Sequence, residues 1–254
     1  MSSMEKMITF HCYSGEYVKL ETPKLESEMK CPRCGGTSGY SWPVDPKVGP
    51  ELMWFCGNDH CLQLDKNKQQ NEIKRARAIV WKDFCIYHNI GDKYWNVCME
   101  DVQQSAEILK KLIAFASKPE GIIMLSGTAG TGKSYASLAV AEYFTRTQSD
   151  ASFFLSSELS ERWANRYNEN AYNLTRKVKE NSLLIIDDFA QVDPMPGFMS
   201  YLFEIINHRT QWSNKGTILT TNHNAKKIAE ICGEALLDRI KKGIWIETKG
   251  QSRR

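Results

Sequence analysis

The sequence predicts an α/β protein in which a parallel sheet is flanked by helices, with a small metal-binding domain before it. Three observations lead to this prediction. From about residue 78 onward, apolar strand patterns alternate with amphipathic helix patterns. One of the strand-to-helix turns is rich in glycine, and four of the eight cysteines are crowded into residues 31–61. Alternating strands and helices imply a sheet with helices on both faces.

The composition excludes several classes of protein. A chain of 254 residues suits one full domain and a small one, and 42% hydrophobic with 25% charged residues is typical of globular proteins. The net charge of +3 is too small to indicate a nucleic-acid partner by itself. No apolar run approaches the roughly 20 residues of a membrane span, and the start, MSSMEKMITF, lacks the apolar core of a signal peptide. We therefore expect a cytoplasmic protein with no membrane partner and with reduced thiols.

Residues 1–67 are predicted to form a zinc-binding docking domain. Cys31 and Cys34 lie in CPRCGG, a tight knuckle, and Cys56 and Cys61 lie about twenty residues later in CGNDHC. Four thiolates around a tetrahedral Zn²⁺ fit this pairing, with His60 as the alternative to Cys61 because the second spacing is wider. Four ligands leave no open position, so the metal is expected to be structural and to stabilise a domain with little core.

The elements of the second domain, residues 88–254, follow a linker assigned to residues 68–87. The stretch 65–77, DKNKQQNEIKRAR, is polar and predicts a linker or an exposed helix. An amphipathic helix precedes Pro119, and a second helix follows the glycine-rich turn, with Ala136, Val140 and Phe144 on one face. Nearly all-apolar strands, as expected of a sheet covered on both faces, are predicted at 122–125, 152–155, 183–186, 217–220 and 244–247.

The glycine-rich turn predicts a nucleotide site. Its sequence satisfies the pattern G-x-x-x-x-G-K-[ST] in full and lies between an apolar strand and an amphipathic helix. Backbone N–H groups of such a turn converge on phosphate oxygens, and the helix adds its positive end. The expected ligand is ATP or GTP, with Lys133 on the phosphates and the Ser134 hydroxyl on Mg²⁺. The nucleotide-binding residues are then Gly127, Thr128, Ala129, Gly130, Thr131, Gly132, Lys133, Ser134 and Tyr135.

Two later strands end in polar residues that suit the same site. Leu183–Ile186 is followed by Asp187 and Asp188, and a buried strand that delivers a carboxylate is what a phosphate-bound Mg²⁺ requires. Asp187 is expected to hold the metal, and Asp188 to polarise the attacking water as a general base. Asn222 follows the strand at 217–220, where a neutral amide can orient the water and sense the γ-phosphate.

An arginine on a short helix near the C-terminus is a candidate for catalysis in trans. Arg239 lies in LLDRIKK, and an arginine inserted into a neighbour's site would neutralise charge on the transferring phosphate. Arg209 and the pair Arg253 and Arg254 are weaker candidates for the same role.

The order GTAGTGKS, LLIIDDF, TILTTN, LLDRI and GQSRR resembles the DnaC/IstB-like branch of AAA+ ATPases over about residues 88–254. This branch includes bacterial and phage helicase loaders and helper ATPases of transposons. The resemblance implies a P-loop AAA+ core with a five-stranded parallel sheet, ATP at the boundaries of a homo-oligomer, and Lys133, Asp187, Asp188, Asn222 and Arg239 in catalytic roles. It also implies that IGDKYW, residues 90–95, precedes the core and packs near the base.

These features suit three functions to different degrees. The preferred one is an ATP-dependent loader of a replicative DNA helicase onto single-stranded DNA, because some loaders carry an N-terminal zinc-containing domain that grips the helicase. The alternative is an IstB-like transposition helper that assembles on DNA and recruits a transposase. A small-molecule kinase ranks last, since it needs neither Arg239 nor the zinc domain.

The stretches 161–167 and 172–179 interleave aromatic and basic residues. Such a surface can stack bases and follow the phosphates of a single strand. The alternative is that Trp163, Tyr167 and Val178 pack a helix against the sheet, which helical spacing predicts equally well. In the resembling loaders, an extra helical element that contacts single-stranded DNA lies at this place.

Overall fold

The computed structural model describes residues 33–35, 39–42, 53–56, 58–146, 150–164, 170–190 and 197–248. The chain divides into two compact units, Met1–Ile73 and Lys74–Arg254, and the boundary lies within the range predicted as the linker. In the first unit, strands β1 (Gly39–Trp42) and β2 (Met53–Cys56) pair antiparallel, with Gly39 opposite Cys56. The end of β2 therefore lies beside the beginning of β1.

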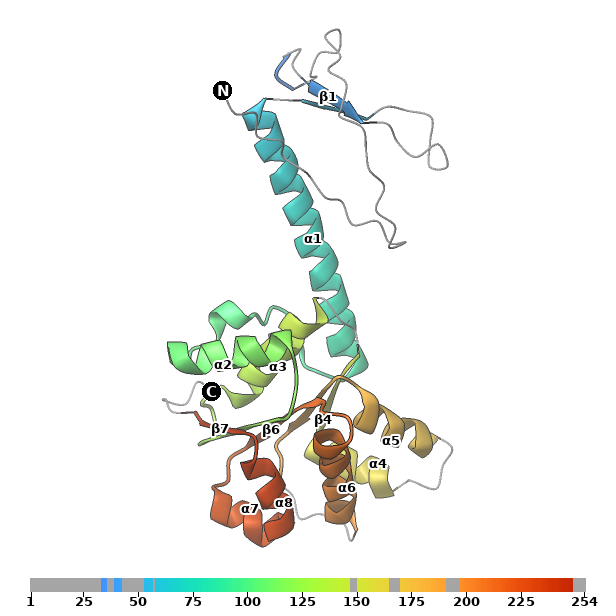
Figure 1. The fold of residues 1–254 in the computed structure, drawn as a ribbon, viewed down its shortest axis with the longest axis vertical. Coiled ribbons are helices and arrows are strands. Elements are labelled where there is room, and N and C mark those ends of the chain that lie inside the picture. The colour runs from blue at the N-terminus through green and yellow to red at the C-terminus, as the bar shows by residue number, and fades with distance from the viewer. Residues whose placement is uncertain are drawn as a thin grey trace. The chain divides into compact units, whose positions relative to one another are not determined.

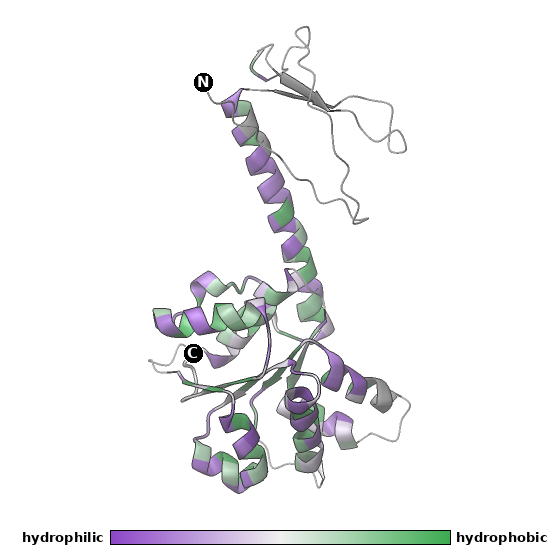
Figure 2. Cartoon of the chain, viewed as in Figure 1, coloured by the Kyte–Doolittle hydropathy of each residue, from purple (hydrophilic) through white to green (hydrophobic). Residues whose placement is uncertain are grey.

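Helix α1 (Asp59–Tyr87) runs through the polar stretch of the sequence. Figure 2 shows it mostly in purple, and its residues are largely exposed up to residue 80. Trp81 and Cys85, near its end, are only 2% and 0% exposed and belong to the core of the second unit, so residues predicted as linker contribute to that core. Neither α1 nor any other helix within the described ranges combines the length and apolarity needed to cross a bilayer.

The second unit is built on a five-stranded sheet. Its strands are β3 (Ile122–Ser126), β4 (Ala151–Leu155), β5 (Leu183–Asp187), β6 (Gly216–Thr221) and β7 (Ile244–Glu247), in the order β4-β5-β6-β3-β7. All neighbouring pairs are parallel. The three central strands are buried at every residue, as expected where helices cover both faces. The predicted α/β fold and the five-stranded parallel sheet are confirmed.

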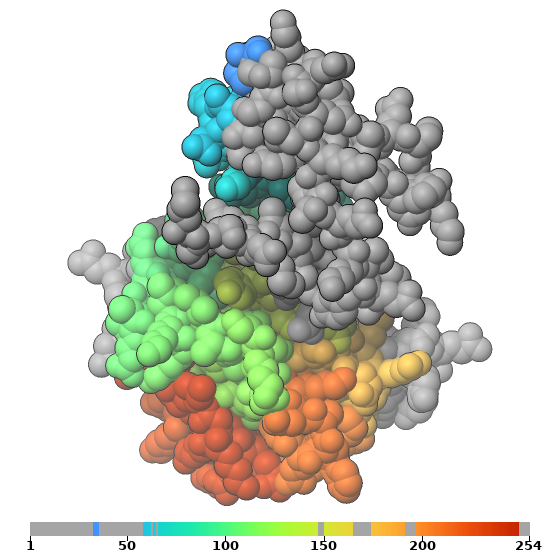
Figure 3. Space-filling view, turned by 45° about the horizontal axis from the view of Figure 1, so that its top comes forward, coloured from blue at the N-terminus to red at the C-terminus, as the bar shows by residue number. Residues whose placement is uncertain are grey.

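Helices cover both faces of this sheet (Figure 1). Helices α2 (Ala106–Ser117) and α3 (Lys133–Thr145), with the end of α1, pack on Ile123, Leu125 and Ile218. The other face holds α4 (Ser156–Ala164), α5 (Asn170–Glu180), α6 (Phe198–Gln211), α7 (Ala225–Cys232) and α8 (Glu234–Lys241). Figure 3 shows the α2–α3 layer in green beside the C-terminal helices in orange and red. Two short 3-10 helices, η1 (Asp92–Tyr94) and η2 (Met99–Asp101), connect α1 to α2.

Arg209, on α6, is a structural residue. Its side chain is fully buried and donates to the Val178, Lys179 and Asn181 carbonyl oxygens at 3.0, 3.2 and 2.8 Å. It also donates to the Gly216 carbonyl oxygen and, at 2.8 Å, to the Thr217 hydroxyl. Burial lowers its pKa to about 9, which still leaves the guanidinium charged at neutral pH. The suggestion that Arg209 acts on a neighbouring subunit is therefore wrong, because it joins the end of α5 to the start of β6.

Candidate functional site

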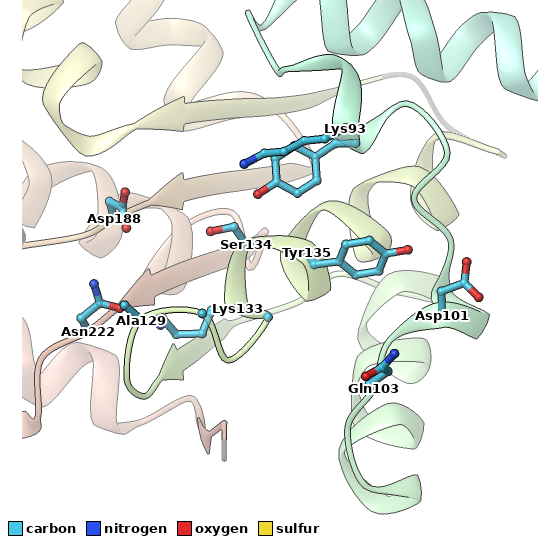
Figure 4. A pocket seen from close by; sticks show the side chains of 12 residues that line it. Lys93, Asp101, Gln103, Ala129, Lys133, Ser134, Tyr135, Asp188 and Asn222 are labelled. Carbon is cyan, nitrogen blue, oxygen red and sulfur yellow. The ribbon is translucent and has the colours of Figure 1, made fainter. Parts of the chain in front are cut away.

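A cavity of about 440 Å³ opens where the central strands of the sheet end. Ligands of open parallel sheets bind at this edge, beyond the carboxyl ends of the strands. Lys133 and Ser134 reach the cavity from the turn after β3, Asp188 from the turn after β5, and Asn222 from the turn after β6 (Figure 4). Four residues predicted from separate motifs thus share one pocket. Its full lining is Lys93, Tyr94, Asp101, Gln103, Ala129, Gly130, Gly132, Lys133, Ser134, Tyr135, Asp188 and Asn222.

The turn from Gly127 to Gly132 depends on its glycines. Gly127, Gly130 and Gly132 have φ angles of 146°, 83° and 85°, which residues with a Cβ atom rarely adopt. Gly132 is the N-cap of α3 and has no side chain to cap the helix, so the first N–H groups of α3 have no side-chain acceptor there. Gly132, Lys133 and Ser134 line the cavity. Backbone donors at a helix N-terminus form a ready site for phosphate.

Thr248, which follows β7, is hydrogen-bonded to Ser126 just before this turn and to Thr131 within it. Its backbone N–H donates to the Ser126 carbonyl oxygen at 2.7 Å, and its hydroxyl lies 2.7 Å from the Thr131 hydroxyl. A Cβ atom added at Gly127 would lie 2.5 Å from the Thr248 hydroxyl oxygen, so only glycine fits there. No sequence motif identified Thr248, because its partners lie more than a hundred residues earlier.

The ammonium group of Lys133 is aligned by the turn itself. It donates to the Gly127 and Thr128 carbonyl oxygens at 3.0 and 2.8 Å, and the residue is only 6% exposed. The Thr131 hydroxyl donates to the same Thr128 carbonyl at 2.9 Å. These bonds fix the cation at the edge of the cavity, where the phosphates of a nucleotide are expected.

The carboxylate of Asp187 connects the turn to the neighbouring strands. It accepts hydrogen bonds from the Ser134 hydroxyl at 2.9 Å and from the Thr220 hydroxyl at 2.5 Å. Burial raises the pKa of Asp187, and the two hydroxyl donors oppose that rise by stabilising the ionised form. Since a hydroxyl and two adjacent carboxylates are oxygen ligands of the kind that Mg²⁺ prefers, the residues fit this metal.

Thr220 also positions the second acid. Its hydroxyl accepts a hydrogen bond from the backbone N–H of Asp188 at 3.0 Å, and the residue is fully buried in β6. Asp188 has a left-handed φ of 54°, and its exposed side chain lines the cavity. Thr220 thus aligns both acids, a role that the sequence motifs did not reveal.

The segment between α1 and α2 supplies a further wall that motif reasoning missed. Lys93 and Tyr94 come from η1, and Asp101 and Gln103 from the end of η2 and the residues after it. The Tyr94 carbonyl oxygen accepts a hydrogen bond from the Trp81 indole N–H at 2.9 Å. The only signal in the sequence was the IGDKYW stretch noted in the family resemblance.

Arg239 does not line this cavity. It lies on α8, half-buried, where its Nε donates to the Asn207 side-chain oxygen at 3.1 Å and its guanidinium lies 6.0 Å from the centre of the Phe203 ring. A catalytic role for Arg239 therefore requires the site of another subunit.

The structure describes only some of the predicted zinc ligands. Cys31 lies outside the described residues, and Cys56 ends β2 but its side chain is not among those described. Cys34 is exposed in a turn, and Cys61 is buried in the first turn of α1. Within the described ranges, no three metal-ligating side chains come together.

The proposed nucleic-acid stretch contains both packing and exposed residues. Trp163 stacks on Tyr201 with ring centres 4.4 Å apart, and Val178 is fully buried, so both pack against the sheet layer. Arg162, Arg176 and Lys177 are exposed. Tyr167 lies outside the described residues.

Several solved structures with a similar fold are described as proteins of DNA replication. The DnaC helicase loader matches with a TM-score of 0.54 at 19% identity, over 63% of this chain and 100% of that chain. DnaI matches with a TM-score of 0.55 at 20% identity, over 65% and 94%. The replication initiator DnaA, bound to AMPPCP and single-stranded DNA, matches with a TM-score of 0.55 at 17% identity, over 63% and 51%. This chain thus spans about half the length of that initiator, and at such identities the likeness establishes the fold alone.

No curated protein sequence matches the chain significantly. The family described as IstB-like ATP-binding proteins matches residues 62–254, which is most of the chain and includes every residue that lines this cavity. The fold, with its AAA+ strand order, and the pocket at its edge agree with that match. The chain therefore belongs to the family of IstB-like ATP-binding proteins.

Proposed function

We propose that the chain hydrolyses MgATP at this pocket and uses the cycle to load a replicative DNA helicase onto single-stranded DNA. One observation carries the ATPase proposal. Side chains from the turns after β3, β5 and β6 share one cavity, and the buried acid Asp187 is hydrogen-bonded to Ser134 of the phosphate-binding turn. Phosphate donors, a metal-binding carboxylate and a second carboxylate are the parts that phosphoryl transfer to water requires.

Each residue then has a defined task. The turn N–H groups and Lys133 bind the phosphates, while Ser134 and Asp187 hold Mg²⁺, which when bound supplies positive charge to the phosphate oxygens. Asp188 accepts a proton from the attacking water, and Asn222 orients that water. Water hydrolyses the γ-phosphate to give ADP and inorganic phosphate, and the proton leaves through the Asp188 carboxyl.

Two substitutions separate binding from hydrolysis. Lys133→Ala removes charge-assisted bonds of about 1.5–3 kcal/mol and should weaken ATP binding about 10- to 100-fold in calorimetry. Asp188→Asn should keep binding within about threefold and lower kcat by 10²–10⁴, the usual contribution of a general base. Normal hydrolysis by Asp188→Asn would remove Asp188 from the mechanism.

The loader proposal draws on the likeness to the DnaC helicase loader and to DnaI, whose structures are covered almost entirely by this chain. The DnaA structure is described as bound to single-stranded DNA, which supports the same kind of partner here. The test is a helicase-loading assay with the full chain, the replicative helicase of its host, and circular single-stranded DNA coated with its binding protein. ATP-dependent unwinding supports the proposal. Unwinding that does not respond to the chain, with ATP-dependent filaments on duplex DNA instead, would favour the transposition helper.

A cationic cleft beside β4 is our candidate for single-stranded DNA. This cavity of about 780 Å³ is lined by Phe84, His88 and Phe154 together with Arg162, Lys177 and one acid, Asp83. Arg162 is also paired with Glu158 at 2.5 Å. Burial lowers the pKa of His88 to about 4, so the positive charge comes from the arginine and the lysine. Cations and ring faces in one groove are the usual means of holding a single strand.

The cleft is tested by removing its charge. A double variant, Arg162→Ala with Lys177→Ala, should weaken oligothymidine binding about tenfold in anisotropy and lower the salt slope by about 1.4, because two phosphate contacts are lost. The matched control, Lys226→Ala with Lys241→Ala, removes the same charge from exposed residues of α7 and α8. Equal losses in both variants would show a general charge effect and contradict the cleft.

We also propose that Arg239 acts on the ATP of a neighbouring subunit in a homo-oligomer. Its position on α8, outside its own cavity, is compatible with this role. Arg239→Ala should keep ATP affinity and lower kcat by about 10³ or more, and mixing it with Lys133→Ala should restore part of the activity through mixed interfaces. Loss of affinity in the single variant, or no recovery on mixing, would contradict the proposal.

For the first unit, we propose a structural zinc ion held by Cys31, Cys34, Cys56 and either Cys61 or His60. The strand register supports this, because Gly39 pairs with Cys56 and lies five residues after Cys34. Metal analysis of purified full-length protein should give about one zinc per chain, and a strong chelator should lower the stability of the first unit. Less than half an equivalent would contradict the site.

A further inference from the structure

Lys93 shares the nucleotide cavity with the phosphate-binding turn but comes from a different part of the chain. It lies in η1, shortly after α1 ends, whereas Lys133 and Ser134 begin α3. Figure 4 shows the Lys93 ammonium turned toward the side that holds Ser134 and Asp188. Asp101 and Gln103 lie on the opposite side, beyond Tyr135. Lys93 therefore faces the end of the cavity where the phosphates are expected.

At this end of the cavity, Lys133 alone would not neutralise the negative charge of a triphosphate, so a second cation could contribute to binding. Lys133 is buried and donates hydrogen bonds to two carbonyl oxygens, and Asp188 adds a negative charge to the lining of the same cavity. Lys93 is exposed and forms no ion pair with any residue that the structure describes; its ammonium lies 4.9 Å from the centre of the Tyr94 ring. A triphosphate carries several negative charges, and a lysine on a flexible four-carbon stem is a common partner for them.

Hydrogen bonds fix the backbone next to Lys93, whereas its side chain is exposed. The Tyr94 N–H donates to the Gly91 carbonyl oxygen at 3.0 Å, and the Trp81 indole donates to the Tyr94 carbonyl oxygen at 2.9 Å. Trp81 is itself only 2% exposed, within the core beneath α3. The base of the Lys93 side chain therefore stays at the rim of the cavity, and its ammonium needs only rotamer changes to reach a phosphate.

We propose that Lys93 is a second phosphate-binding cation, which contacts the triphosphate from the segment that joins α1 to the sheet domain. This inference rests on the nucleotide site of the proposed function. It implies that a bound triphosphate contacts η1 through Lys93, and that the Tyr94–Trp81 hydrogen bond connects this contact to the end of α1.

Lys82 provides a matched control within the same region. It is exposed, and its ammonium lies 4.3 Å from the centre of the Trp95 ring, but it does not line the cavity. Lys82→Ala and Lys93→Ala thus remove the same charge and the same kind of ring contact. Only Lys93→Ala also removes a cation from the nucleotide cavity.

The experiment measures MgATP affinity of the full chain by calorimetry at several salt concentrations. Lys93→Ala should bind about tenfold more weakly and with a smaller salt dependence, while Lys93→Arg and Lys82→Ala stay within about threefold of the unchanged protein. Unfolding temperatures without nucleotide should agree among all four proteins. Unchanged affinity in Lys93→Ala, or an equal loss in Lys82→Ala, would overturn the inference. Failure of the unchanged protein to bind ATP would overturn the proposed function itself.

Discussion

Thr220 offers the most direct test of how the two acids are positioned. Its buried hydroxyl donates to the Asp187 carboxylate and accepts from the backbone N–H of Asp188. Thr220→Val has nearly the same shape, so it removes both hydrogen bonds while β6 keeps its packing. Thr220→Ser restores the hydroxyl and is the control.

The magnitude follows from these two bonds. A hydrogen bond to a charged group is worth about 1.5–3 kcal/mol and a neutral one about 0.5–1.5 kcal/mol, so Thr220→Val should lower the free energy of unfolding by about 2–4 kcal/mol. Misplacing catalytic groups by about 1 Å typically costs about 10² in rate. We therefore expect kcat to fall about 100-fold, while ATP affinity changes little because the phosphate-binding turn is untouched.

A pH profile distinguishes positioning from a general loss of structure. The Thr220 hydroxyl stabilises the ionised form of Asp187, so its removal raises further a pKa that burial has already raised. The acid limb of the kcat profile should therefore move to higher pH in Thr220→Val and return in Thr220→Ser. Urea unfolding and steady-state ATPase assays complete the test. If Thr220→Val keeps kcat within threefold, or if Thr220→Ser fails to recover, the role assigned to Thr220 is wrong.

Three further predictions concern residues with other tasks. Asp187→Asn should abolish hydrolysis yet stabilise the nucleotide-free protein near pH 7. Burial raises the pKa of Asp187 above its ordinary value of 3.8, so its ionised form destabilises the fold at neutral pH, and the gain seen in urea unfolding should shrink as the pH falls toward 3.8. Gly127→Ala should lower the free energy of unfolding by about 1–3 kcal/mol through its φ angle alone. It should also weaken ATP binding, because an added Cβ atom clashes with Thr248. Equal ATP affinity in calorimetry would contradict this. Arg209→Met should lower the free energy of unfolding by about 3–5 kcal/mol, because five buried or partly buried acceptors lose their donor, while the ATP affinity of the folded protein stays unchanged. A small change in urea unfolding would refute the structural role of Arg209.

The fold and the centre of the site were predictable because their signals are local. The turn 127–134 is one continuous motif, and Asp187, Asp188 and Asn222 each follow an apolar strand. Parallel strands end at the same edge of a sheet, so topology alone brings these residues together. The structure confirms the five-stranded sheet and places Lys133, Ser134, Asp188 and Asn222 at one cavity. Asp187 does not line that cavity but is hydrogen-bonded to Ser134.

The supporting residues were not predictable, because their roles depend on contacts between distant segments. Thr220 and Thr248 look like ordinary strand residues, and Lys93 looks like an ordinary surface lysine. Arg209 was misjudged for a similar reason. Charged residues are mostly exposed, and nothing in the sequence shows that five acceptors converge on one guanidinium.

The position of β7 has a consequence for communication between α8 and ATP. Gly243 lies between α8 and β7, where an added Cβ atom would clash with the Ile122 carbonyl oxygen. The connection between α8 and β7 is therefore tightly packed against β3. The far end of β7 leads to Thr248, which is hydrogen-bonded to the Ser126 carbonyl oxygen just before the phosphate-binding turn. A protein that shifts α8 on docking would therefore alter nucleotide affinity, and by thermodynamic reciprocity ATP would change the affinity for that protein by the same factor.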